Sequence, residues 1–272
     1  MMIHPYLYHH GIKGQKWGVR NGPPYPLDKK TDSKDDNVKK LLSAYVGCDP
    51  ASILSCIAIA KIFLSSLMAS HAAKKDRDNQ SNELDDLKNK SSVKSLDDLP
   101  KLTQPMTAEE SMKVTNPGFP DGDTTQNCTF CTSAMAMREK GYDVVANESP
   151  HPWHVNLFDK VWGSTQFVMM PSTVHDSASM LKELASHGSG TYGNLTVASI
   201  FGGGHSVFWK NENGRVRIYD GQSGQEYVRG RDDATFFDLI NYQNSAYNRL
   251  DNCDPTEYAL AVTRPRGEGG TR

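Results

Sequence analysis

The chain has few cysteines, and they follow no repeated pattern. The five are Cys48, Cys56, Cys128, Cys131 and Cys253. An odd number without recurring spacing argues against a disulfide scaffold and favours a reducing compartment. Cys128 and Cys131 form one Cys-x-x-Cys pair, but the rest of the globular domain offers no second pair of cysteines or histidines at the short spacing that a zinc site needs. We therefore expect no metal, and no cofactor is implied.

The sequence also lacks a strong net charge and a leader segment. A net charge of −2 over 272 residues gives no overall basic field, so no nucleic acid partner is expected. Residues 1–27 contain no apolar core of a signal peptide, which indicates cytoplasmic synthesis. The one hydrophobic run, 51–70, carries Lys61 near its middle. A central lysine costs about 2.5–3.5 kcal/mol on insertion, so we expect a helix packed on protein, with membrane contact as the alternative.

Composition divides the chain into regions. Residues 1–40 are polar and rich in turns, and 41–71 hold the apolar run, which is predicted to be helical. Residues 72–101 mix charges of both signs and have almost no aromatic residues, as in a linker or a solvated helix. We expect this non-globular or helical region to precede a globular domain at 102–266, with a disordered tail at 267–272.

The globular part predicts a helix followed mainly by strands. Asn127 is expected to cap a helix from Cys128 to Lys140 that ends at Gly141. Further helices are expected at 174–187 and 233–242. Strands are expected at 142–146, 166–170, 195–201, 204–209, 216–220, 226–229 and 257–263. A leading helix with mostly antiparallel strands is an α+β layout.

Two of these strands form a predicted hairpin that brings a histidine to an aspartate. With a turn at 211–214, His205 directly faces Asp220, and their Cβ atoms lie about 4.5–5.5 Å apart. A two-residue turn at 213–214 is the stronger sequence signal for a tight hairpin, but it places Val207 opposite Asp220. We favour the longer turn because it keeps apolar residues opposite one another.

A cysteine precedes this hairpin at the start of the predicted helix. Unpaired N–H groups and the helix dipole stabilise a thiolate at Cys128, and Cys131 lies one turn later. A thiol, an imidazole and a carboxylate in this order form the nucleophile, base and orienting group of a hydrolase. The structural alternatives are small buried cysteines, a core histidine at His205, and an aspartate, Asp220, that only begins a turn.

Several separated motifs of the globular part resemble the papain-fold toxin (Tox-PL) domains. The motifs span about residues 113–264 and are Asn116-Pro117, Asn127-Cys128-x-x-Cys131, Arg138-x-x-Gly141-Tyr142-Asp143-Val144, Gly204-His205 and Tyr219-Asp220-Gly221-Gln222-Ser223-Gly224. The resemblance implies a papain-like cysteine hydrolase domain, with a helix packed on an antiparallel sheet. It also implies a protein substrate, which is either cleaved or deamidated at glutamine.

The same resemblance implies roles for individual residues. Cys128 would be the nucleophile, His205 the base and Asp220 the orienting carboxylate, while Asn127 or Gln222 would help to position groups near the oxyanion. Papain itself attacks with the second cysteine of a Cys-x-x-Cys, whereas its deamidase-like relatives place the nucleophile at the helix start. We favour Cys128 and keep Cys131 as the alternative.

The first region carries a second resemblance. Residues 8–20, YHHGIKGQKWGVR, are similar to a segment that recurs at the ends of proteins encoded by phages and prophages of Gram-positive bacteria. This implies a phage-encoded protein in the host cytoplasm or the virion, with residues 1–40 docking on phage structural proteins. The expected function is a cysteine hydrolase, virion-associated or a toxin; the alternative is an inactive virion protein that uses its papain-like domain for binding.

Overall fold

The computed structural model describes residues 79–149, 151–153, 157–163, 165–201 and 203–267. The predictions for 1–40 and 41–71, including the apolar run, fall outside these residues. Within the described ranges, no helix has both the length and the apolar character needed to span a membrane.

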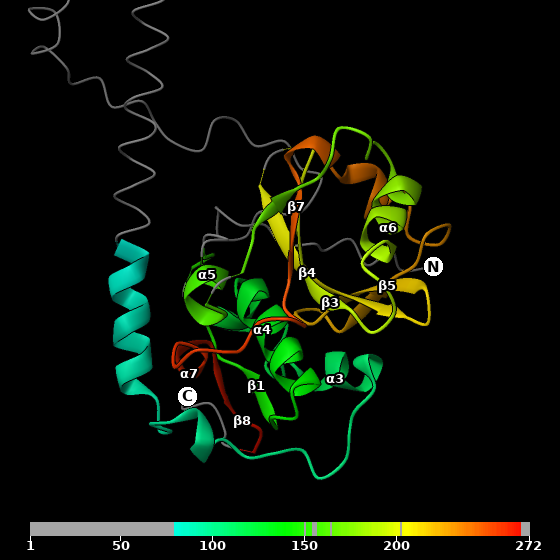
Figure 1. Cartoon of the computed structure of the whole chain (residues 1–272). Coiled ribbons are helices and arrows are strands. Elements are labelled where there is room, and N and C mark those ends of the chain that lie inside the picture. The colour runs from blue at the N-terminus through cyan, green and yellow to red at the C-terminus, as the bar shows by residue number, and fades with distance from the viewer. Residues whose placement is uncertain (1–78, 150, 154–156, 164, 202, 268–272) are drawn as a thin grey trace, which may run out of the picture. The chain divides into compact units, whose positions relative to one another are not determined.

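An antiparallel sheet of six strands, in the order β2-β7-β3-β4-β5-β6, positions the rest of the fold (Figure 1). Its strands are β2 (Val168–Met169), β3 (Tyr192–Ala198), β4 (Gly204–Glu212), β5 (Arg215–Asp220), β6 (Gln225–Tyr227) and β7 (Ala246–Arg249). A smaller antiparallel pair joins β1 (Val144–Ala146) to β8 (Thr263–Pro265). The predicted α+β architecture, with a helix packed on an antiparallel sheet, is confirmed.

Helices pack on both faces of the large sheet. On one face lies α4 (Cys128–Glu139), which also contacts β1, and on the other lies α6 (Ser177–Ala185), next to β5. Further α-helices are α3 (Ala108–Val114), α5 (Leu157–Val161), α7 (Ala259–Val262) and a helix over residues 79–90. Short 3-10 helices lie at Leu96–Asp98, Gly122–Thr125, Phe237–Leu239 and Tyr242–Asn244.

Strand β4 contributes side chains to two hydrophobic cores, because successive side chains point to opposite faces of the sheet. Phe208 packs into the core that contains the α4 residue Met135. Val207 and Trp209 pack into the other core, with Met180 of α6. Helix α4 is buried along almost its whole length. This burial holds the helix in one position over the sheet.

The buried guanidinium of Arg138 fixes α3 against α4. Its Nη1 donates to the carbonyl oxygen of Ser111 at 2.9 Å and to Oγ1 of Thr115 at 2.7 Å. Burial lowers the pKa of Arg138 to about 10, so the side chain is still a cation at neutral pH. This cation satisfies acceptors at the end of α3, where helix carbonyls have no helical partner.

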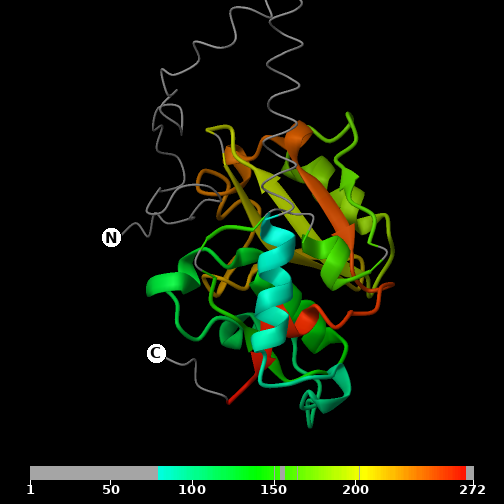
Figure 2. The ribbon, with the colours of Figure 1, turned by 90° about the vertical axis from the view of Figure 1, so that its left-hand side faces the viewer.

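The charged stretch before the expected domain boundary packs on the domain. Residues 79–90 are helical, and the compact unit includes the chain from Gln80 onward, earlier than the boundary expected at residue 102. Leu84 and Leu99 are buried in the α4 core. The hydroxyl of Tyr258 donates to Asp85 at 2.6 Å, and Figure 2 shows the helix lying beside α7. Its apolar side makes this helix part of the fold, not a solvated connector.

Two of the predicted elements are wrong. Residues 233–242 form turns and a 3-10 helix, because Asp232 and Asp233 accept hydrogen bonds from the backbone N–H groups of Val228 and Gly230 and hold a loop. Residues 257–263 were expected to be a strand, but 259–262 form α7. The elements β7, α3 and α5 are not among the predicted ones, although Thr107 and Glu110 form the capping box that starts α3.

The preferred hairpin register is wrong as well. Trp209 pairs with Ile218, as the two-residue turn requires. Asn213 and Gly214 have φ angles of 54° and 88°, and a type I′ turn needs positive φ at both positions. Continuing this register puts Val207 opposite Asp220. Matching apolar residues across the hairpin predicts the wrong register, because Asp220 obtains polar partners from outside the hairpin.

Candidate active site

His205 and Asp220 meet although they are not directly opposed. The observed register differs from the favoured one by two residues, and a shift of two keeps a side chain on the same face of a strand. The pair is therefore diagonal, with Cβ atoms about 7–8 Å apart, a gap that long side chains can bridge. Nε2 of His205 lies 3.0 Å from Oδ2 of Asp220, and both side chains are almost fully buried. The N–H of Nε2 is not well aligned on this oxygen, so the contact is mainly electrostatic.

Asp220 accepts several further hydrogen bonds. Its Oδ1 accepts from the backbone N–H of Gln222 at 2.9 Å. Its Oδ2 accepts from the hydroxyl of Ser223 at 2.7 Å and from that of Tyr227 at 3.1 Å. Burial acts to raise the pKa of Asp220, but His205, the hydroxyl of Ser223 and the N–H of Gln222 outweigh it and lower the pKa. The carboxylate is therefore charged in the folded protein.

Ser223 and Tyr227 were not singled out from the sequence. Tyr227 pairs with Ile218 on β5, so it lies on the face of Asp220 and reaches it diagonally, as His205 does from the other side. Pairing the short strand at 226–229 with β5 would have found this contact. Ser223 lies in the turn after Asp220, where a local hydrogen bond to the carboxylate is common.

The thiol of Cys128 contacts the other side of the histidine. Cys128 is the first residue of α4, and its thiol lies close enough to the His205 side chain to affect the pKa of the imidazole. Since Nε2 faces Asp220, Nδ1 is the ring nitrogen left for the thiol. Burial acts to lower the pKa of His205, but Asp220 and Cys128 together raise it above its ordinary value. The imidazolium that results is the partner a thiolate nucleophile needs.

Cys131 has a different environment one turn along α4. Its thiol is fully buried and donates to Oδ1 of Asn127 at 3.4 Å. Burial raises the pKa of Cys131 well above its usual value, and the nearby Cys128 and Asp220 add to this effect. A thiol that stays protonated is a weak nucleophile. Of the two cysteines, Cys128 therefore has the geometry of an attacking group.

Asn127 and Gln222 are positioned differently from the sequence expectation. Asn127 precedes α4, but its side chain does not cap the helix. Its Nδ2 donates to Oδ1 of Asn116 and the carbonyl of Asn147, and Nε2 of Gln222 donates to Oδ1 of Asn127 and the carbonyl of Thr124. Both amide nitrogens thus already make two hydrogen bonds. They brace the loop before α4, and the first-turn backbone N–H groups are the donors left for an oxyanion.

The described side chains contain no cluster of three or more His, Cys, Asp or Glu residues that could hold a metal ion. The groups that this site offers for chemistry are the thiol of Cys128, the imidazole of His205 and the carboxylate of Asp220. In that arrangement the imidazole can exchange a proton with the thiol on one side while the carboxylate stabilises its charge on the other.

Comparison with known proteins identifies one family. The model of the family described as papain fold toxin 1, glutamine deamidase, matches residues 126–225. No curated protein and no solved structure gives a significant match. The matched span begins just before Cys128 and ends at the start of β6, and it includes His205 and Asp220. The resemblance to papain-fold toxins is confirmed over this span: residues 126–225 are similar to the papain-fold glutamine deamidase toxins.

Proposed function

We propose that this protein is a papain-like cysteine hydrolase that deamidates glutamine side chains of a protein substrate. Cys128 is the nucleophile, His205 the acid and base, and Asp220 the group that orients His205. The observation that carries the proposal is the buried His205 ring, which contacts a thiol at a helix start and a charged carboxylate. The family similarity favours glutamine over a peptide bond as the target.

The reaction begins with the proton of Cys128 on His205. The thiolate attacks the side-chain carbonyl carbon of glutamine, and the first-turn N–H groups of α4 stabilise the oxyanion. His205 gives its proton to the leaving nitrogen, so ammonia departs and a thioester remains. His205 then takes a proton from water as the water oxygen attacks the thioester. The thiolate leaves, which restores the thiolate–imidazolium pair, and the carboxylic acid product loses its proton to ammonia or solvent to give glutamate.

Mass spectrometry distinguishes deamidation from proteolysis. Wild-type protein, Cys128→Ala and Cys131→Ala would each be incubated with a lysate of a Gram-positive bacterium. We expect glutamine-to-glutamate changes with wild type and Cys131→Ala but not with Cys128→Ala. New peptide termini that depend on Cys128 would show a protease instead. Equal peptide maps for wild type and Cys128→Ala would contradict both activities and favour a binding domain.

We also propose that the protein is phage-encoded and that residues 1–40 dock it on phage structural proteins, which places it in the virion or the host cytoplasm. The similarity of residues 8–20 to phage-associated segments supports this. Purified phage particles from the encoding strain should contain the full-length protein and lack a variant without residues 1–40. Equal amounts of both in the particles would contradict a docking role.

A further inference from the structure

Three amide side chains meet between the loop that precedes Cys128 and the turn that follows Asp220. They belong to Asn116, just after α3, to Asn127, directly before Cys128, and to Gln222, two residues after Asp220. Asn127 and Gln222 are buried and Asn116 is partly buried. This amide cluster therefore lies between the two segments that carry the nucleophile and the orienting carboxylate.

Within the cluster, Asn116 and Asn127 form a reciprocal amide pair. Nδ2 of Asn116 donates to Oδ1 of Asn127 at 3.3 Å, and Nδ2 of Asn127 donates back to Oδ1 of Asn116 at 3.1 Å. Because each amide both donates and accepts, the pair fixes the position and the plane of both groups. Asn116 thus ties the start of α4 to the end of α3.

The same amide of Asn116 also holds the turn after Asp220. Its Nδ2 donates to the carbonyl oxygen of Gln222 at 3.0 Å and to that of Thr124 at 2.9 Å. The backbone N–H of Gln222 in turn donates to Oδ1 of Asp220 at 2.9 Å. One side chain is therefore bonded both to the residue before the nucleophile and to the residue that holds the carboxylate.

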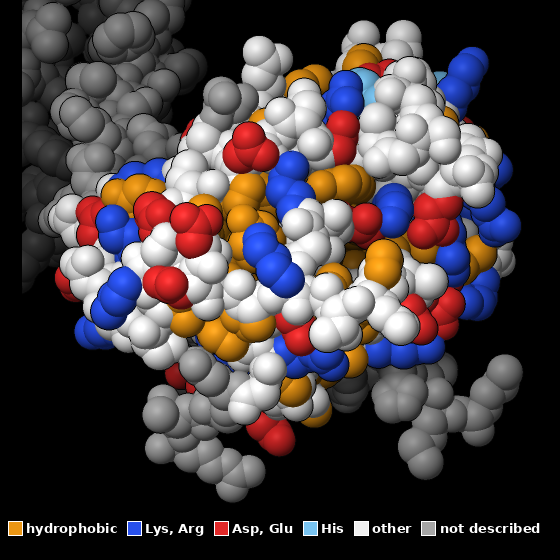
Figure 3. Space-filling view, turned by 60° about the horizontal axis from the view of Figure 1, so that its bottom comes forward, with side chains coloured by type: hydrophobic (Ala, Val, Ile, Leu, Met, Phe, Trp, Pro, Cys, Tyr) orange, Lys and Arg blue, Asp and Glu red, His pale blue; other side chains and the backbone are white. Residues whose placement is uncertain are grey.

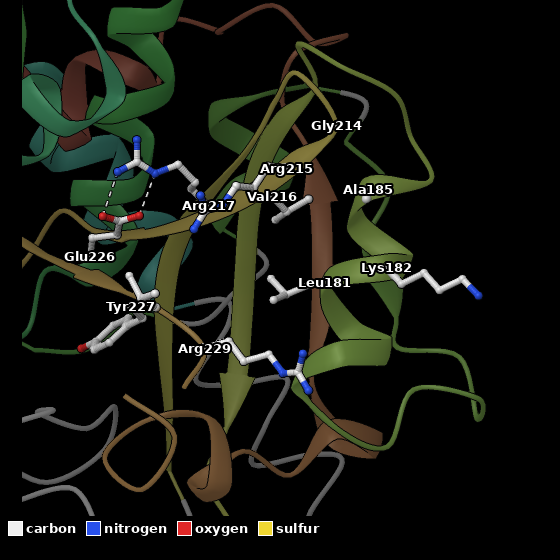
Figure 4. A pocket seen from close by; sticks show the side chains of 11 residues that line it. Leu181, Lys182, Ala185, Gly214, Arg215, Val216, Arg217, Glu226, Tyr227 and Arg229 are labelled. Atoms are coloured by element: carbon white, nitrogen blue, oxygen red, sulfur yellow. Dashed lines mark hydrogen bonds and ion pairs between the residues drawn. The ribbon is translucent and has the colours of Figure 1, made fainter. Parts of the chain in front are cut away.

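The turn over residues 221–224 is packed tightly enough to transmit this contact. A Cβ at Gly221 would lie only 2.9 Å from Sδ of Met135, so the turn backbone packs directly on α4. Across the β5–β6 hairpin, Arg217 binds both carboxylate oxygens of Glu226 at 2.7 and 2.8 Å (Figure 4). Because the turn is held on both sides, a shift of its backbone carries over to the carboxylate at its start.

The cluster also takes the place of a side-chain cap on α4. An asparagine before a helix commonly accepts a hydrogen bond from one of the first backbone N–H groups. The Asn127 side chain instead bonds to Asn116 and Gln222 and does not cap the helix. The N–H groups that stabilise the oxyanion in the proposed reaction are then not used by this side chain. The cluster therefore favours the site over the stability of the helix end.

We propose that Asn116 is a positioning residue of the active site, which sets the distance between the start of α4 and the carboxylate that orients His205. Loss of its amide lets the loop before Cys128 and the turn after Asp220 move apart, so the imidazolium stabilises the thiolate less. The importance of Asn116 for catalysis rests on the proposed function, whereas its effect on the thiolate–imidazolium pair does not.

The pH dependence of iodoacetamide labelling at Cys128, followed by mass spectrometry on the full chain, tests this role. In Asn116→Ala we expect the midpoint of labelling to rise by about one pH unit, because the thiolate loses part of its electrostatic stabilisation. Easier access to the thiol changes the limiting rate at high pH but not the midpoint. Asn211→Ala is the matched control, because this buried amide bonds to the carbonyl of Ala185 and the N–H of Gly214, away from the site.

An unmoved midpoint in Asn116→Ala, or an equal rise in Asn211→Ala, would overturn the proposal. Asn116→Ser, with a shorter side chain that cannot bridge the same partners, has the same expected rise and replaces the alanine variant if that variant does not fold. A raised midpoint without glutamine deamidation by wild type would leave the positioning role standing while the proposed function fails. Deamidation by wild type with an unmoved midpoint would show the reverse.

Discussion

The carboxylate of Asp220 has more hydrogen-bond partners than it needs to orient one histidine. Its two oxygens accept hydrogen bonds from the backbone N–H of Gln222 and from the hydroxyls of Ser223 and Tyr227. Oδ2 also lies next to the ring of His205. The hydrogen bonds stabilise the charged form. The contact between His205 and Asp220 was predictable, because a shift of the hairpin register by two residues leaves every side chain on the same face of its strand. The Tyr227 contact was not predictable without the β5–β6 pairing, whereas the Ser223 contact is local to the turn that follows Asp220.

Removing the Ser223 hydroxyl should weaken this support. The hydrogen bond favours the carboxylate, so Ser223→Ala raises the pKa of Asp220, and the acid limb of kcat/KM moves to higher pH. We expect kcat to fall by up to about tenfold, or about 1.4 kcal/mol. The pH–rate profile measures this, with Ser172→Ala, an exposed serine, as the control. An unmoved acid limb would show that the bond does not act on Asp220.

The raised pKa of His205 has a consequence for stability. A folded-state pKa above the unfolded value contributes stability that is fully present below about pH 6.5 and is lost as pH rises through the folded value. Urea unfolding at pH 6 and pH 9 should therefore show a larger loss for Cys128→Ala than for Cys128→Ala/His205→Gln. The first substitution removes titration of the thiol. Equal losses in the two proteins would show that Asp220 alone does not raise the pKa of His205.

Among the elements, the helix α4 was predicted closely and the hairpin only in part. The helix has a clear start at Cys128 and a clear end at Gly141, whose φ is 87°. The hairpin register depended on which neighbours Asp220 finds in space, and no local pattern contains these. Helix α7 was missed because a short apolar run fits a buried helix and a buried strand equally well.

The turn between β4 and β5 depends on the backbone conformation of Gly214. Gly214 has a φ of 88° with no atom near the place of a Cβ, so Gly214→Ala meets backbone strain alone. We expect a loss of about 1–2 kcal/mol in the free energy of unfolding, measured by urea denaturation. Asn213→Gly, which suits the same turn, is the control and should change little. A neutral Gly214→Ala would contradict the type I′ turn and the register that follows from it.

For the molecule as a whole, burial rather than charge determines where the domain begins. On the face shown in Figure 3, acidic and basic side chains are intermixed, in keeping with the small net charge. The mixed charges of 72–101 suggested a solvated segment, yet Leu84 is buried to 1% exposure in the α4 core. Charge composition describes the exposed face of an amphipathic helix and says little about its buried face.

Leu84→Ala should therefore destabilise the whole domain. Deleting a buried leucine side chain costs about 2–5 kcal/mol, and thermal unfolding by circular dichroism would show this as a lower Tm. The exposed Asn82→Ala on the same helix is the control. If Leu84→Ala melts like wild type, the helix over 79–90 does not contribute to the folded core.

The rate of alkylation at each thiol distinguishes a cysteine activated by His205 from a pair of inert buried cysteines. Full-length protein would be treated with iodoacetamide at neutral pH, and modification of Cys128 and Cys131 followed by mass spectrometry over time. The pairing of Cys128 with His205 and Asp220 predicts that Cys128 reacts faster than a free cysteine, that Cys131 reacts far more slowly, and that His205→Gln removes the difference. Equal rates at the two thiols, or a rate at Cys128 unaffected by His205→Gln, would contradict the account.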